Sequence, residues 1–184
     1  TPAIVLGAGG GTISAGTGAT LAIAGVVSGS GNLTVGSSGN AGTVTFSGNN
    51  TYSGTTLIAA GTLSVASGGT SGSTGLSTSA VTIRGGSLLV NNTGTVSNAI
   101  TLDTGSNKLA TATTKIATFS GIISGAGTGA LTVGDTTNNG TVIFSNSNTY
   151  TGGTTITSAN LKLNSGGVLG AGDVTNNGTL TFNN

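Results

Sequence analysis

Carboxylates are the side chains best suited to catalysis here, and this sequence of 184 residues has only three. Asp103 opens the segment DTGS at 103–106, which follows an apolar run and resembles half of an aspartic protease site. That chemistry requires two carboxylates that share a proton. No second segment of this kind exists, and Asp135 stands in the different context GDTTNN. The simpler interpretation is an Asp-Gly turn after a strand at 99–102.

Other catalytic and metal-binding sites lack their essential residues. The chain has many Ser and Thr, but no His that could serve as a base and no Cys. Glycoside hydrolysis would need clustered carboxylates, whereas Asp103, Asp135 and Asp173 are far apart in the sequence and Glu is absent. We therefore predict a non-enzymatic protein with no catalytic, cofactor-binding or metal-binding residue and no cofactor. A carbohydrate-binding or carbohydrate-degrading β-helix stays open as an alternative, which two Asp residues close together in a groove would support.

Hydroxyl and aromatic side chains suggest two binding functions. The pairs Thr43/Thr45, Thr155/Thr157 and Thr179/Thr181 each place two hydroxyls on one side of a strand, as in some ice-binding solenoids. Their irregular spacing favours ordinary exposed strand positions, so ice binding is kept as an alternative. Tyr52 and Tyr150 could stack on carbohydrate, but both occupy the same place in a repeated phrase, which favours a packing role.

Charge is nearly absent from this chain. Four Lys or Arg and three Asp give a net charge of +1, which predicts no binding to nucleic acid or to an anionic membrane. No apolar run approaches the ~18 residues of a membrane helix, so we expect no membrane contact from this segment. The first residues, TPAIVLGAGG, do not resemble a signal peptide. If the protein is exported, we expect its signal to be removed or to lie outside this segment.

Hydrophobic periodicity predicts strands throughout and essentially no helix. Short alternating runs are bounded mostly by Gly, Asn or Ser, as strands are. These runs cover residues 32–35, 43–46, 62–65, 80–83, 87–90, 99–102, 115–119, 130–133, 141–144, 154–157, 160–163 and 179–182.

The chain repeats itself after about 98 residues. The phrase NNTYSGTT at 49–56 returns as SNTYTGGTT at 147–155, and we expect its Asn and Gly to shape a corner and its Tyr to cover the core. The two approximate repeats cover about 20–92 and 116–184. We therefore predict one solenoid segment over 1–184, made of two repeats.

The scarcity of aromatic and charged residues favours a parallel β-solenoid over two β-sandwiches. Sandwich cores use bulky aromatics, and this chain has no Trp, two Tyr and four Phe. Coils of a solenoid stack about 4.8 Å apart, so a repeated charge would face its own copy. We expect an all-β, parallel β-solenoid of about six to eight coils and roughly 30–40 Å in length.

Two segments resemble a known repeat family. Residues 42–65, GTVTFSGNNTYSGTTLIAAGTLSV, and 140–163, GTVIFSNSNTYTGGTTITSANLKL, resemble the passenger-associated transport repeat of bacterial autotransporter-type surface proteins. The first segment lacks one Gly of the usual pair, and the second has Asn160 where Gly is usual. The resemblance implies a right-handed parallel β-helix in an extracellular or cell-surface bacterial protein, with a structural or transport-supporting role.

A mechanical role is the function that we expect. The segment would form a stalk, an adhesin shaft or a surface filament, with its exposed end strands covered by further repeats or by end-to-end association with copies of itself. Surface glycans are a further possible partner class.

Overall fold

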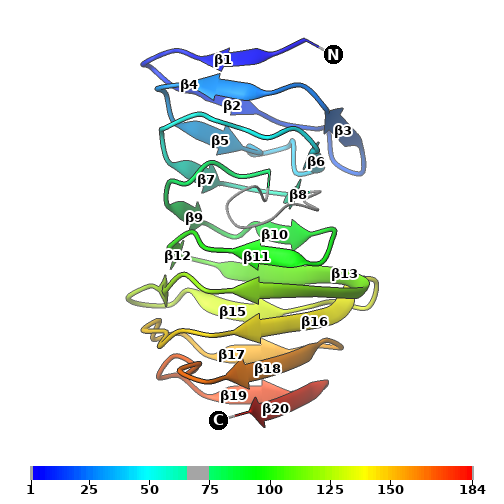
Figure 1. Ribbon diagram of the computed structural model, residues 1–184, viewed down its shortest axis with the longest axis vertical. Coiled ribbons are helices and arrows are strands. Elements are labelled where there is room, and N and C mark those ends of the chain that lie inside the picture. The colour runs from blue at the N-terminus through cyan, green and yellow to red at the C-terminus, as the bar shows by residue number, and fades with distance from the viewer. Residues whose placement is uncertain (1, 66–74, 184) are drawn as a thin grey trace.

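The protein forms a rod in which the chain winds in about seven coils from the N-terminal end to the C-terminal end (Figure 1). The computed structural model describes residues 2–65 and 75–183. Every pairing between its named strands is parallel, and neither described range contains a helix. In these ranges, accordingly, no helix is long and apolar enough to cross a membrane. The prediction of an all-β parallel solenoid is confirmed.

Twenty short strands make up the described coils. The N-terminal half contains β1 (Ile4–Leu6), β2 (Gly11–Ile13), β3 (Thr20–Ile23), β4 (Val27–Gly29), β5 (Leu33–Val35), β6 (Thr43–Phe46), β7 (Thr56–Ile58), β8 (Thr62–Val65), β9 (Val81–Ile83) and β10 (Ser87–Val90). The C-terminal half contains β11 (Gly94–Val96), β12 (Ile100–Leu102), β13 (Ser106–Phe119), β14 (Ile123–Ser124), β15 (Ala130–Val133), β16 (Asn139–Phe144), β17 (Thr154–Ile156), β18 (Asn160–Asn164), β19 (Val174–Asn176) and β20 (Thr179–Asn183).

The strands fall into stacks along the rod. The first stack is β1 and β4; the second is β2, β5, β7, β9, β12 and β14. The third stack runs from β3 through β6, β8, β10, β13, β15 and β17 to β19, and the fourth consists of β11, β13, β16, β18 and β20. The long strand β13 belongs to two stacks, because Ser106–Leu109 pairs with β15 and Ile116–Phe119 pairs with β16. The register shift between Thr111 and Ile116 marks the corner between these two faces.

The core fills the interior along the rod with side chains from alternate strand positions. In β6, for example, Val44 and Phe46 are buried, while Thr43 and Thr45 between them are only partly buried. This alternation follows from the two-residue period of a strand. Phe119 and Phe144 on adjacent coils meet edge to face, with ring centroids 6.1 Å apart. Aliphatic residues supply most of the remaining core.

Hydrophobic patterning located the well-alternating strands and missed the shortest ones. All twelve predicted runs overlap strands, and 43–46, 62–65, 87–90 and 130–133 match their bounds. The strands β1, β2, β3, β4, β7, β11, β14 and β19 were not predicted, nor was the first half of β13. Most of these have two to four residues, too few to show a period, and they form because a neighbouring coil supplies hydrogen-bond partners.

The strand pairings show that equivalent strands of the two repeats are separated by four complete coils and one further face of the rod. Leu33 pairs with Thr56, and the same stack continues through Val81 and Ile100 to Ile123, which completes four coils. Leu131, the counterpart of Leu33, lies one strand further along the chain and in the next stack. Equivalent strands of the two repeats therefore occupy neighbouring faces of the rod.

Candidate functional site

Asp103 forms a turn and an ion pair between coils, as the simpler interpretation of DTGS predicted. Its Oδ1 accepts a hydrogen bond from the Thr104 amide at 2.8 Å, and Gly105 has a φ of +92°. Its Oδ2 lies 2.7 Å from Nε of Arg84 on the preceding coil. The hydrogen bond from Arg84, followed by that from Thr104, holds the pKa of Asp103 below its usual value. The Asp103 carboxylate therefore closes its own turn and links two coils.

Asp135 is bound even more closely by its own turn. Partial burial raises its pKa, but hydrogen bonds from the Thr137 hydroxyl and from the amides of Asn138 and Thr137 outweigh burial. The pKa therefore lies well below the usual range. Lys108 on the preceding coil adds an ion pair, with Nζ 3.2 Å from Oδ2. This carboxylate closes a turn and links two coils.

The first two acidic residues are kept apart by a strand. The backbone of Asp103 lies against Gly129, just before β15, whereas Asp135 follows the end of β15. The four residues of β15 alone span roughly 13 Å. Within 2–65 and 75–183, no three His, Cys, Asp or Glu side chains gather as a metal site would require. The juxtaposition that would support carbohydrate chemistry is not formed by Asp103 and Asp135.

Tyr52 and Tyr150 are buried and paired with Thr, so the favoured packing role is confirmed. Their exposed fractions are 1% and 0%. The Tyr52 hydroxyl lies 2.6 Å from Oγ1 of Thr56, and the Tyr150 hydroxyl lies 2.7 Å from Oγ1 of Thr154. Burial raises the pKa of Tyr150, and its bond with Thr154 opposes this. Neither ring is available to stack on a sugar.

The Asn residue two positions before each Tyr joins three successive coils. Asn50 Oδ1 accepts the Val27 amide at 2.8 Å, and its Nδ2 donates to the Gly75 carbonyl on the opposite side. Asn148 repeats this arrangement, accepting from Ile123 at 2.8 Å and donating to Val168 at 2.8 Å. We call Asn50–Tyr52–Thr56 and Asn148–Tyr150–Thr154 the Asn–Tyr–Thr clusters.

These contacts correct one sequence prediction. The Asn side chains were expected to shape their own corner, but they instead satisfy the backbone of the coils on either side. The sequence contained one usable signal: an Asn stands two residues before the Tyr in both phrases. What was missing was the identity of the backbone groups that each Asn reaches, because they are 20 or more residues away.

The Gly of each phrase permits close contact between coils. A Cβ on Gly54 would lie 2.2 Å from the Gly31 carbonyl oxygen, and one on Gly152 would lie 2.1 Å from that of Gly129. Backbone cannot move aside cheaply, so any side chain here would push two coils apart. Gly is required at these places by proximity to the preceding coil.

The Thr pairs do not assemble into one array. Thr43/Thr45 and Thr155 lie in the third stack but five strand pairings apart, and Thr179/Thr181 lie in the fourth. In the third stack, residues that pair in register from one strand to the next form a row along the rod. This row consists of Thr20, Thr43, Thr62, Ser87, Lys108, Thr132, Thr155 and Thr175. A row one residue wide, interrupted by Lys108, differs from the flat array that ice binding was expected to need.

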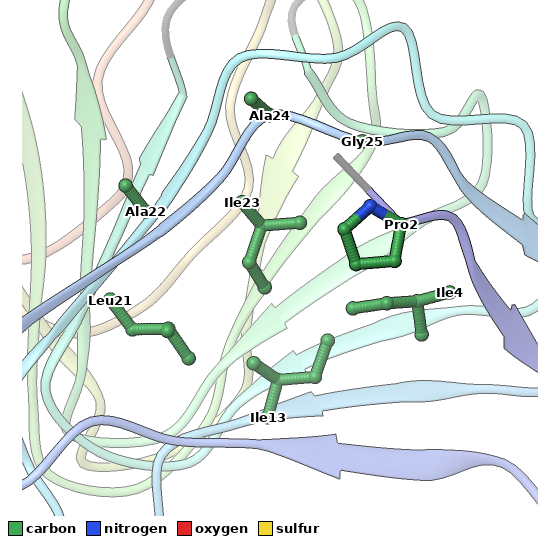
Figure 2. A pocket seen from close by; sticks show the side chains of 8 residues that line it. All are labelled: Pro2, Ile4, Ile13, Leu21, Ala22, Ile23, Ala24 and Gly25. Atoms are coloured by element: carbon green, nitrogen blue, oxygen red, sulfur yellow. The ribbon is translucent and has the colours of Figure 1, made fainter.

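Both ends of the rod expose core side chains around a hollow. At the N-terminal end, a hollow of about 290 Å³ is surrounded by Pro2, Ile4, Ile13, Leu21 and Ile23 (Figure 2). At the C-terminal end, a hollow of about 340 Å³ is lined by Leu163, Gly167, Val168, Leu169, Gly170 and Phe182. Neither lining contains a charged side chain.

Comparison with known families matched one model, the passenger-associated-transport-repeat, at residues 39–65 and 136–163. Each matched segment contains an Asn–Tyr–Thr cluster and the strands that flank it. The comparisons with curated proteins and with solved structures gave no match.

Proposed function

We propose that this β-solenoid, which carries two passenger-associated transport repeats, serves as a rigid shaft in an extracellular bacterial protein. The repeat match and the fold support an extracellular, structural role of the passenger type. The Asn–Tyr–Thr clusters carry the proposal of a shaft. Their side chains are buried and are engaged with one another or with the backbone of neighbouring coils, so the repeated phrase holds coils together.

Stiffness follows from this construction. Each coil is hydrogen-bonded to its neighbours through parallel strands, and the aliphatic core continues from coil to coil. Seven coils at about 4.8 Å give a rod of roughly 34 Å. Two ion pairs, Arg84–Asp103 and Lys108–Asp135, also join successive coils. A rod of this kind can hold a domain at a fixed distance from the surface that anchors it.

Surface display tests the proposal. The chain is placed between an epitope and an outer-membrane anchor, and the height of the epitope above the membrane is measured by electron cryotomography. We expect the solenoid to add roughly 34 Å. Replacing both Tyr52 and Tyr150 with Ala removes two large buried side chains and should replace this fixed height by a broad distribution of heights, because an unfolded chain has no fixed length. Thr101→Ala, at an exposed position, is the matched control.

Two results would count against a shaft. One is an epitope height that does not change when the solenoid is inserted. The other is the same narrow distribution of heights in the Tyr52→Ala/Tyr150→Ala variant after protease digestion has shown that its coils are unfolded. Protease resistance of the Thr101→Ala control establishes that the displayed chain is folded.

A further inference from the structure

Buried Asn side chains join successive coils over most of the rod. Asn50 and Asn148 each hold three coils together. A third buried residue, Asn98, donates two hydrogen bonds of 2.6 Å from its Nδ2 to the carbonyls of Ser77 and Ser79 on the preceding coil. These side chains satisfy backbone groups that water reaches poorly, so each bond stabilises the junction that it crosses.

A fourth buried residue strengthens the same junction as Asn98. Asn107, which is fully buried, accepts a hydrogen bond of 2.9 Å from the Gly85 amide on the preceding coil. The four Asn residues divide the rod into two blocks. Their bridges join the coils from β4 to Thr111, which we call the N-terminal block, and the coils from Ile116 to β19, which we call the C-terminal block.

The boundary between the two blocks lacks a bridge of this kind. One side consists of β11, β12 and Ser106–Thr111, and the other of Ile116–Phe119, β14 and β15, and we call this boundary the central junction. Three parallel strand pairings cross it, as inside the blocks. Among the residues that the structure describes, however, no buried Asn side chain bonds across it. The central junction therefore relies on strand pairing, core packing and more exposed contacts.

The side chains that do bond across the central junction lie at or near the surface. Lys108 and Asp135 form an ion pair of 3.2 Å, and their side chains are 33% and 26% exposed. Further bonds at exposed or partly buried atoms run from Thr113 to Thr137 and Asn139, from Ile116 to Thr93 and from Ser124 to Ile100. Water competes for bonds of this kind, so each contributes less than a buried one.

The corner where the chain crosses the central junction carries several unfavourable features. The register of β13 shifts between Thr111 and Ile116, and Thr114 within this corner has a φ of +67°. The Thr111 hydroxyl is buried and has no hydrogen-bond partner among the described residues. Beside the corner, Gly94 pairs with Ala117, so two small residues meet across the junction. Strain, an unpaired polar group and light packing coincide at one place.

We propose that the shaft opens first at the central junction, where the two blocks part while each block stays folded. This inference rests on the proposed shaft and gives it a defined place to yield. The stability of a solenoid is close to a sum of terms for single coils and for the junctions between them, so the weakest junction separates cooperative units. The opened junction can close again, because each block keeps the strands with which the other pairs.

Native-state hydrogen exchange tests the proposal on the unmodified chain. Three amides donate across the central junction: Ile100 to Ile122, Ser120 to Val96 and Gly134 to Leu109. Two matched amides donate inside the blocks: Ala59 to Val35 and Thr157 to Val133. We expect the first three to exchange at least about tenfold faster, which is the effect of one typical buried hydrogen bond on an opening equilibrium.

A disulfide across the central junction should remove this difference. Thr101 and Ser124 pair across it, and the chain has no Cys of its own. The oxidised variant Thr101→Cys/Ser124→Cys should slow exchange at Ile100 and Ser120 to the rates found inside the blocks. The matched control Thr82→Cys/Thr101→Cys joins β9 to β12 within the N-terminal block, so it should leave both amides fast.

A second variant tests the junction without cysteine chemistry. Thr111→Val keeps the shape of the side chain and removes the unpartnered hydroxyl, so exchange at Ser120 and Gly134 should slow by about tenfold. Thr34→Val, at a partly buried position inside the N-terminal block, is the control and should leave these amides unchanged.

Two results would overturn the proposal. One is equal exchange across the central junction and inside the blocks, and the other is fast exchange that persists in oxidised Thr101→Cys/Ser124→Cys. Neither result bears on the shaft, whose test is the height of the displayed epitope. A chain that adds no height but exchanges fast at the central junction would overturn the shaft and leave the division into two blocks.

Discussion

The segment from β2 to β3 and the strand β13 occupy equivalent positions, since β2 and β3 pair with β5 and β6 as the two halves of β13 pair with β15 and β16. Their side chains differ at two of these positions, and both differences leave β13 less comfortable. Thr114 has a φ of +67°, whereas its equivalent Gly18 has a φ of +79°. The left-handed region is unfavourable for a β-branched residue and accessible to Gly. Similarly, Thr111 is the one buried side chain in the described ranges whose oxygen lacks a hydrogen-bond partner, and its equivalent is Ala15.

Replacing Thr114 with Gly should stabilise the protein. Relief of the left-handed strain is worth about 1–2 kcal/mol, and the greater freedom of Gly in the unfolded chain offsets roughly 0.5–1 kcal/mol of that. We expect a net gain of about 0.5–1 kcal/mol in the free energy of unfolding, measured by denaturant titration.

The reverse change at the equivalent corner is the control for this prediction. A Cβ on Gly18 would meet no atom within 4 Å, so Gly18→Thr tests the backbone conformation alone. By the same balance of strain against Gly freedom, it should destabilise the protein by about 0.5–1 kcal/mol. A loss of stability in Thr114→Gly would show that the Thr side chain contributes more than its strained backbone costs.

Strands of three residues persist in this fold because each is paired along its length with the coils beside it. Isolated strands so short have no stability of their own. The buried Asn side chains extend this pairing into the corner that precedes Tyr52 and Tyr150, where no regular strand exists. An element of this protein is therefore stable only as part of a stack.

Removing Asn50 should weaken the stacking of three coils. Asn50→Ala leaves the Val27 amide and the Gly75 carbonyl without their partner, and each such loss costs about 1–3 kcal/mol. We expect the free energy of unfolding to fall by about 2–4 kcal/mol, and amide exchange at Val27 to quicken.

The neighbouring residue gives a control of the same chemical type. Asn49 is exposed, and Asn49→Ala should change stability by less than about 0.5 kcal/mol. Equal effects of the two substitutions would mean that the inter-coil hydrogen bonds of Asn50 contribute nothing beyond loss of an Asn.

The whole molecule is a rod of nearly uncharged coils, and its stability should respond little to pH near neutrality. No His or Glu is present, so no side chain of ordinary pKa titrates between about pH 5 and 8. The charges that do occur between coils are paired as Arg84–Asp103 and Lys108–Asp135. Acid is therefore the condition that should loosen the stack.

The acid response should come mainly from Asp135. Partial burial raises the pKa of Asp135, but the hydrogen bonds from Thr137 and Asn138 lower it by a larger amount. The folded pKa therefore lies below the unfolded value of about 3.9. Its contribution to stability is complete above the unfolded pKa and is lost as pH falls through the folded one. Unfolding free energy should be level from about pH 5 to 8 and decline below about pH 4.

Asp135→Asn identifies the source of that decline. The variant should be less stable than the native protein at neutral pH and should lose less on acidification. A steep change in native stability near pH 6 or 7 would contradict this assignment, because no side chain described above changes charge there.

Alternating Val, Leu, Ile and Phe with Thr between them determined the class of fold by themselves, because a period of two can bury only one face of a strand. Neutral composition and the NTY phrase indicated stacked coils built twice, and the Asp103 turn and the packing role of Tyr52 could be predicted. Only the tertiary structure decided which residues meet across coils. Asn50 reaches backbone groups more than 20 residues away on both sides, and β3 or β19 becomes a strand only beside its neighbour. The second repeat begins one face further around the rod than the first. This offset depends on the combined length of four coils, which no local pattern in the sequence predicts.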